Sequence, residues 1–116
     1  MRNHAVFAAL LAAGLAAAEP AAAGDAKAAP APVPITIANF HFNPPTLAVT
    51  AGTTVVWANE DDSPHTLLAD DRSFRSAALD TGDKFSYTFA TPGDFHYRCG
   101  IHPMMQGEII VRPAGH

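Results

Sequence analysis

The chain has 116 residues, room for one small domain but not for a separate substrate domain, which argues against a complex enzyme. Its 11 acidic residues outnumber its 7 lysines and arginines, giving a formal net charge of −4 with neutral histidines, so nucleic acid is a poor candidate partner. The single cysteine, Cys99, rules out a disulfide within the chain, and the domain must therefore be stabilised by its core or by a bound metal.

The first 23 residues have the pattern of a secretory signal peptide. Arg2 precedes an apolar stretch from Ala5 to Ala18, which leads into small-residue sites that suit cleavage. An uncleaved membrane anchor is the alternative, but the stretch is alanine-rich and shorter than the roughly 20 residues that a spanning helix needs. We therefore predict export to the periplasm, a flexible alanine- and proline-rich leader over residues 24–34, and one domain over residues 35–116.

The domain consists of short runs rich in Val, Ile, Thr, Phe and Tyr that are separated by turn residues, a pattern typical of β-strands. The clearest runs are 35–42, 46–50, 53–59, 84–89, 95–99 and 107–112. Aromatic and polar residues alternate in 84–89, and the turn at 91–94 predicts a hairpin with 95–99. Residues 70–82 could hold a short strand or a helical turn. The pattern predicts an all-β, Greek-key β-sandwich of about seven to eight strands.

One segment between two predicted strands, residues 97–107, carries the chemistry. It offers a thiolate from Cys99, an imidazole from His102 and thioethers from Met104 and Met105. Soft sulfur ligands combined with imidazole suit copper, and two histidines, one cysteine and a weak, distant methionine define an electron-transfer copper centre. Zinc could use the same cysteine and histidines, but a methionine is a poor zinc ligand. A second histidine is still needed.

Three histidines elsewhere in the predicted domain are candidates for that ligand. His65 follows the acidic run 60–62 and begins a predicted strand, so it could be delivered to the end of a sandwich. His96 lies within a strand and should point to the face opposite Tyr97 and Cys99, toward solvent. His41 alternates with two phenylalanines and should also face solvent. We therefore select His65, and we interpret the acidic runs 60–62 and 70–71 as solvated loop surface.

These residues resemble those of a known family. Cys99, His102 and Met105 form a Cys-x-x-His-x-x-Met pattern that is preceded by Tyr97 and followed by a Gly-x-Ile-x-Val strand, and it is similar to the plastocyanin/azurin superfamily of cupredoxins, most of all to amicyanin-type members with a short ligand loop. The resemblance implies that the axial ligand is Met105 rather than Met104. The resemblance also implies that Thr66 lies close to the cysteine sulfur.

The resemblance implies one type 1 copper ion, bound by His65, Cys99, His102 and Met105, that carries single electrons between periplasmic redox proteins. These partners would dock transiently near His102, which Ile101, Pro103 and Met104 surround. We expect a monomer without nucleic acid or stable membrane insertion. Because the sequence contains no G-x-S-x-G elbow or phosphate-binding loop, we do not expect an enzyme. The alternatives are a copper-binding protein of copper homeostasis or delivery, and a structural sandwich with a buried cysteine.

Overall fold

The computed structural model describes residues 30–115, which form eight β-strands. The predicted signal peptide lies outside this range, and the first strand begins two residues before the predicted start of the domain. No helix in the described part of the chain is long and apolar enough to cross a membrane. The strands are β1 (Val33–Ala38), β2 (His41–Asn43), β3 (Thr46–Thr50), β4 (Thr53–Asn59), β5 (Leu68–Ala69), β6 (Lys84–Phe89), β7 (Gly93–Arg98) and β8 (Gln106–Arg112).

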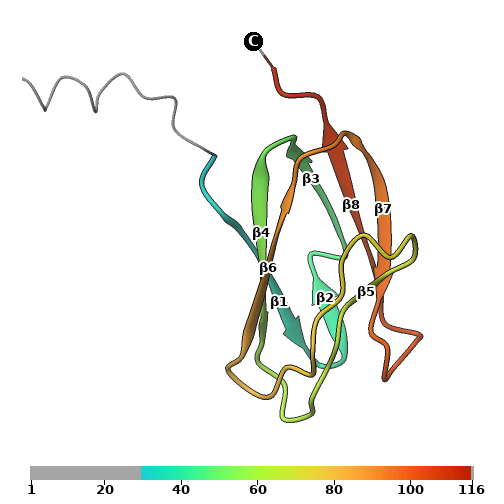
Figure 1. Cartoon of the computed structure of the whole chain (residues 1–116). Coiled ribbons are helices and arrows are strands. Elements are labelled where there is room, and N and C mark those ends of the chain that lie inside the picture. Colours follow the sequence, from blue (N-terminus) through green and yellow to red (C-terminus); the bar gives the residue numbers. More distant parts are fainter. Residues whose placement is uncertain (1–29, 116) are drawn as a thin grey trace, which may run out of the picture.

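The strands form two four-stranded sheets that pack face to face (Figure 1). One sheet has the order β2-β1-β4-β6 and the other β3-β8-β7-β5. Two neighbouring pairs, β1 with β4 and β3 with β8, are parallel, and the others are antiparallel. The predicted all-β sandwich is therefore confirmed.

Alternation along the strands places one face of each sheet in the core, as a half-buried strand requires. The pattern is strict in β4, where every second residue is buried. Aromatic side chains fill the centre of the core, with Trp57 fully buried against Tyr97 and Phe74. The core also contains Ile35, Ile37, Phe42, Val49, Val55, Leu67, Ala69, Leu79, Phe89, Ile109 and Val111.

The run predicted as one strand over residues 35–42 is interrupted, and this prediction was wrong. β1 ends at Ala38, and Asn39 and Phe40 form a turn with φ of 53° and 59° before β2 begins. Phe40 is consequently half exposed, whereas Phe42 is buried. Apolar alternation predicted one extended strand because it gives no sign that the N–H groups of Asn39 and Phe40 donate to the side chain of Asp61, far along the chain.

The hairpin predicted between residues 84–89 and 95–99 was also wrong. β6 pairs with β4 in one sheet, and β7 pairs with β8 and β5 in the other. The chain between them crosses the sandwich, so that Phe89 and Phe95 meet with ring centroids 5.5 Å apart. Alternation shows which face of a strand is buried, but it does not show which strand is its neighbour.

The segment between β5 and β6, which the sequence left open, holds neither a helix nor a named strand. Isolated bridges tie it to the rest of the chain, Leu79 to His65 and Arg75 to Leu68. Phe74 and Leu79 are buried. The segment therefore covers the core without extending either sheet.

Candidate metal centre

The loop between β7 and β8 folds back on itself. Cys99 follows β7 directly, and its N–H donates to the Met105 carbonyl at 3.0 Å, while the Met105 N–H donates to the His102 carbonyl at 2.9 Å. Cys99 is fully buried, and His102 is partly exposed. Two strands that pair along their whole length thus fix both ends of a short loop and hold its sulfur and imidazole side chains near one another.

His65 comes from the opposite side of the site, in the chain between β4 and β5. It was predicted to begin a strand, but it forms only an isolated bridge with Leu79, donating and accepting backbone hydrogen bonds of 3.1 and 2.7 Å. The strand itself begins later, at Leu68. The His65 side chain is fully buried.

The structure brings the three predicted donors His65, Cys99 and His102 together. Cys99 Sγ lies 3.7 Å from His65 Nδ1 and 3.8 Å from His102 Nδ1, and the three atoms all lie within 4.8 Å of one another. A nitrogen and a sulfur ligand at about 2.0–2.3 Å from one ion in tetrahedral or trigonal geometry lie about 3.6–3.8 Å apart. The observed spacings therefore fit a single ion bound between these atoms.

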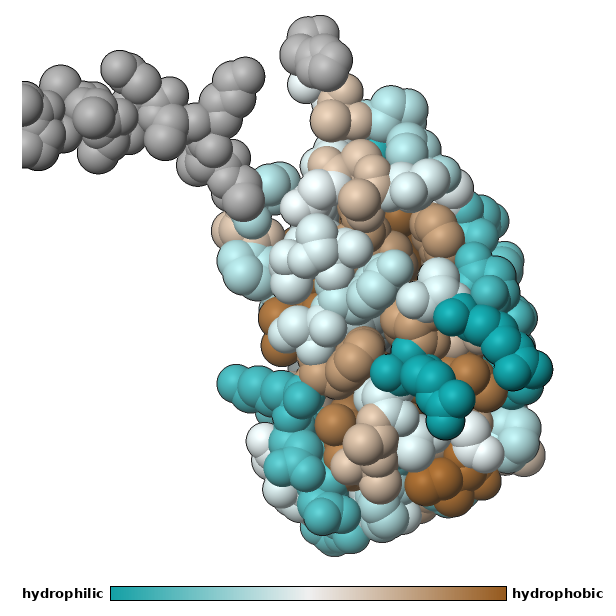
Figure 2. Space-filling view, viewed as in Figure 1, coloured by the Kyte–Doolittle hydropathy of each residue, from teal (hydrophilic) through white to brown (hydrophobic). Residues whose placement is uncertain are grey.

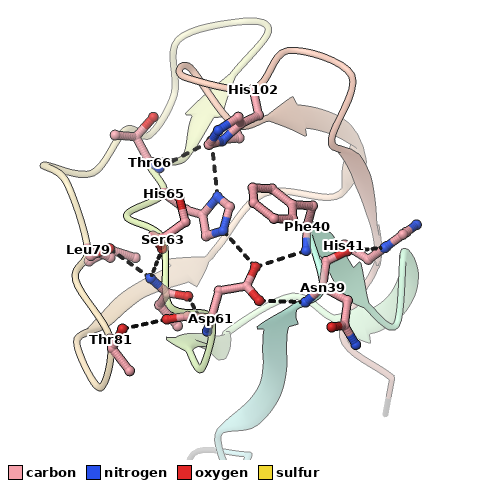
Figure 3. A network of polar contacts seen from close by, with 12 residues as sticks. Asn39, Phe40, His41, Asp61, Ser63, His65, Thr66, Leu79, Thr81 and His102 are labelled. Carbon is pink, nitrogen blue, oxygen red and sulfur yellow. Dashed lines mark hydrogen bonds and ion pairs between the residues drawn. The ribbon is translucent and has the colours of Figure 1, made fainter.

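Asp61 sets the orientation and the tautomer of His65. Its Oδ2 lies 2.8 Å from His65 Nε2 (Figure 3). An ionised carboxylate only accepts hydrogen bonds, so Nε2 carries the proton and the lone pair of Nδ1 faces Cys99. Carboxylates commonly position metal-binding histidines in this way. Burial alone would raise the pKa of Asp61, but hydrogen bonds from the Phe40 N–H and from His65 outweigh it and lower the pKa below the usual value.

The environment of Cys99 favours the thiolate, which is the form that binds metals. Burial opposes ionisation, but hydrogen bonds from backbone N–H groups, above all that of Thr66 at 3.4 Å from Sγ, outweigh it and lower the pKa of Cys99 to about 6. The Thr66 hydroxyl accepts the Gly100 N–H at 2.9 Å. A Cβ at Gly100 would lie only 2.9 Å from that hydroxyl. The predicted contact of Thr66 with the sulfur is thus confirmed, and Thr66 also holds the loop.

The two methionines of the loop have opposite environments. Met105 is 4% exposed, whereas Met104 is 87% exposed. Only Met105 therefore belongs to the interior side of the loop, as expected for the axial ligand. Met104 lies with the half-exposed Ile101 and Phe40 among the large apolar residues at the surface. Phe40, Met104 and Met105 also line a cavity of about 290 Å³ with His41, His102 and Gln106.

The remaining histidines of the described chain are at the surface, as predicted. His41 is exposed, and its Nδ1 lies 2.7 Å from the Asn39 carbonyl. The His96 side chain is 58% exposed and lies 3.7 Å from carboxylate oxygens of both Asp94 and Glu108. This second group of donors is solvated, and exposed carboxylates of this kind are common without a bound ion.

Sequence reasoning missed three residues near the site. Asp61 was interpreted as solvated surface, but its side chain is only 12% exposed. Asn59 is fully buried, donates to the Ser63 and Leu79 carbonyls, and accepts the Asp61 N–H, which organises the loop before His65. Phe40 was taken as a strand residue. An acid four positions before a selected histidine is a usable signal for Asp61, because metal-binding histidines tend to have such partners.

Comparison with known proteins agrees with this fold. The model of the cupredoxin-like domain family matches residues 6–111. The chain is 32% identical over 109 residues to amicyanin-alpha of Methylorubrum extorquens, covering 90% of this chain and 86% of that protein. It is 28% identical over 91 residues to amicyanin of Paracoccus denitrificans, covering 74% and 70%. The chain belongs to the cupredoxin family.

Solved structures extend the similarity to the arrangement of the strands. A purple cupredoxin from Nitrosopumilus maritimus has a TM-score of 0.66 and 32% identity, covering 68% of this chain and 98% of that chain. The oxidised form of an amicyanin point mutant has a TM-score of 0.65 and 27% identity, covering 69% and 81%. The resemblance inferred from the ligand loop, to cupredoxins of the amicyanin type, is thus confirmed.

Proposed function

We propose that this protein is a periplasmic electron carrier with one type 1 copper ion bound by His65, Cys99, His102 and Met105, and that it is not an enzyme. The observation that carries the proposal is the convergence of two Nδ1 atoms on a buried, low-pKa thiol, with the His65 lone pair directed at the sulfur by Asp61. A buried set of one thiolate, two imidazoles and a thioether suits copper better than zinc. The predicted signal peptide supports the location.

Bound copper supplies the Cu(II)/Cu(I) couple, and the protein holds the donors in place. The His65 bridge, the Asp61 hydrogen bond and the closed loop around Cys99 restrict movement of the donors from both sides. The hydrogen bond from the Thr66 N–H to the sulfur stabilises negative charge on the thiolate, which is one way in which proteins tune such sites. Small rearrangement on a change of charge favours rapid electron exchange.

The partly exposed His102 provides the route to partners. Around it the surface is apolar, with Phe40 48%, Ile101 49% and Met104 87% exposed. Figure 2 shows a hydrophobic group at the lower right of the molecule, where Figure 1 places the β7–β8 loop. A small apolar contact of this kind suits a monomeric carrier that docks redox proteins transiently, since small interfaces release quickly.

The visible spectrum after addition of Cu(II), repeated after a mild reductant, tests the proposal. We expect an intense blue absorption band that bleaches on reduction and returns on reoxidation. Cys99→Ser keeps the size of the side chain and should abolish the band. A colourless product from the folded wild-type protein would overturn the proposal.

A matched pair of substitutions tests the methionine assignment. Met105→Leu keeps the buried volume but removes the sulfur, so the metal-free protein should lose less than about 1.5 kcal/mol of stability. In the copper form, however, the spectrum and redox potential should shift. Met104→Leu is the control and should change neither, because Met104 is almost fully exposed. Equal shifts in both variants would contradict the assignment of Met105.

One observation favours copper delivery as the second candidate function. The Met104 thioether is 87% exposed beside the cavity that His102 lines, so a soft donor is available at the surface. A delivery protein should release Cu(I) to a chelator within the time of partner exchange, and Met104→Leu should slow that release. A carrier should retain its copper in the same assay while still exchanging electrons.

A further inference from the structure

The turn between β1 and β2 contains one unfavourable residue. Ala38 and His41 pair across it, so Asn39 and Phe40 are the two central residues of a two-residue loop, both with positive φ. Such turns favour asparagine followed by glycine. Asn39 therefore fits, but Phe40, at φ 59°, occupies a region that bulky side chains avoid. Something outside the turn must hold it there.

The carboxylate of Asp61 holds this turn. Its Oδ1 accepts the Asn39 N–H at 2.6 Å, and its Oδ2 accepts the Phe40 N–H at 2.9 Å. The same Oδ2 accepts the His65 Nε2–H. Asp61 is itself fixed, because its N–H donates to the Asn59 side chain and its carbonyl accepts the hydroxyl of Thr81. Figure 3 shows the carboxylate between the turn and the imidazole.

The ring of Phe40 lies against both candidate metal-binding imidazoles. Its centroid is 5.3 Å from that of His65 and 5.1 Å from that of His102, with interplanar angles of 83° and 84°. The two imidazole centroids are themselves 5.1 Å apart. The other side of the phenyl ring remains in solvent, because Phe40 is 48% exposed. A strained, half-exposed residue that contacts both imidazoles contributes little to the core, and its position is explained by the site instead.

We propose that Phe40 is a positioning residue that closes the solvent side of the proposed copper site, and that Asp61 anchors it there while orienting His65. The inference rests on the proposed function. The phenyl edge occupies the approach between the two imidazoles, so it excludes water and small anions from the bound ion and keeps the rings from tilting outward. The Asp61 carboxylate thereby orients His65 and also holds Phe40 over the site.

The test measures binding of azide to the Cu(II) protein by the change in its visible spectrum. Phe40→Gly removes the ring and suits the positive φ, so the protein should fold. We expect azide to bind at least about tenfold more tightly than to wild type, a difference of roughly 1.4 kcal/mol. Ile101→Ala is the matched control, because Ile101 is equally exposed on the ligand loop but is not in ring contact with the imidazoles. It should leave azide affinity unchanged.

Asp61→Asn tests the anchor. The amide has one accepting oxygen in place of two, so it loses at least one of the three hydrogen bonds that the carboxylate accepts from Asn39, Phe40 and His65, and its NH2 group then faces a donor. We expect azide affinity to rise in the same direction as in Phe40→Gly. A folded Asp61→Asn protein with wild-type azide affinity would overturn the anchoring role, and an unchanged Phe40→Gly protein would overturn the cover.

A metal-free readout separates this inference from the proposed function. In the protein without copper, the rate at which diethyl pyrocarbonate modifies His102, followed by peptide mass spectrometry, should rise severalfold in Phe40→Gly and not in Ile101→Ala. If wild type forms no blue band, the proposed function fails, but this rate still measures shielding by Phe40. If the blue band forms and neither azide affinity nor the modification rate responds to Phe40→Gly, the inference fails and the proposed function stands.

Discussion

Replacement of Gly107 by alanine should be unusually costly for a change of one methyl group. Gly107 pairs with Tyr97 across β7 and β8. A Cβ at position 107 would overlap the Tyr97 Cζ and hydroxyl and would lie 2.7 Å from its Cε1. Carbon atoms pack best at about 3.5–4.0 Å, so the ring would have to move by roughly 1 Å. The Tyr97 ring therefore lies so close to the backbone at position 107 that only glycine fits there.

The surroundings of Tyr97 leave no room for that movement. The residue is 1% exposed, and its ring lies 4.7 Å from that of Phe42 and 5.5 Å from that of Trp57. Overpacking in a core costs about 1–3 kcal/mol, and we expect the upper end here. With a urea m-value of about 1–3 kcal/mol/M, the unfolding midpoint should fall by about 1–3 M.

Urea unfolding of the metal-free protein, followed by fluorescence of its single tryptophan, measures this loss. Gly115→Ala is the control, because a Cβ there meets no atom within 4 Å. Since Tyr97 lies two residues before Cys99, the copper spectrum of Gly107→Ala should shift as well. A loss below about 0.5 kcal/mol, which is the ordinary range for a surface substitution, would refute the close-approach argument.

Three further predictions follow from other parts of the structure. Removal of copper should lower the melting temperature by about 10–20 °C, compared with protein in free copper at 100 times its Kd. At that concentration, binding to the folded state alone stabilises the protein by about 2.7 kcal/mol. Identical melting curves would count against a preformed site. A side-chain hydrogen bond with Asp94, together with the charge of Asp94, raises the pKa of Glu108. Asp94→Asn should therefore lower the pKa of Glu108 toward the usual value in an NMR titration. The destabilising repulsion between the two carboxylates should be present above the raised pKa and lost as pH falls through it. Phe40→Gly should change the free energy of unfolding of the metal-free protein by less than about 1 kcal/mol in chemical denaturation. The reason is that relief of about 1–2 kcal/mol of backbone strain offsets the lost packing of a half-exposed ring. In the same assay Phe42→Ala, in the core, should lower the free energy of unfolding by about 3–5 kcal/mol.

The candidate donors could be selected from the sequence because most of them are local. Cys99, His102 and Met105 lie within seven residues between two strands, so their proximity needs no knowledge of the sheet order. His65 required only one further inference, that its loop reaches the same end of the sandwich. Alternating polarity likewise identified the buried faces of most strands, since a period of two is a local property.

The interactions around these donors could not be predicted in the same way, because they depend on which strands are neighbours. β1 runs parallel to β4, with Ile37 opposite Asn59, and the Glu60 N–H donates to the Ile37 carbonyl at 2.8 Å. Parallel pairing brings the ends of both strands to the same edge of the sheet. The turn after β1 and the loop after β4 therefore emerge side by side, a relation that neither segment shows alone.

This pairing explains how an acidic residue of an ordinary surface run becomes the organising group of the site. Asp61 follows β4 by two residues, so its carboxylate meets the N–H groups of the turn after β1 on one side and His65 on the other. Its neighbours Glu60 and Asp62 have the same charge but remain exposed, as the sequence predicted for the whole run. Position relative to the paired strand ends, and not acidity, thus distinguishes Asp61. The fold therefore sets the orientation of His65 and the placement of Phe40 through a single side chain. A substitution that displaces one of these two residues should also change the position of the other.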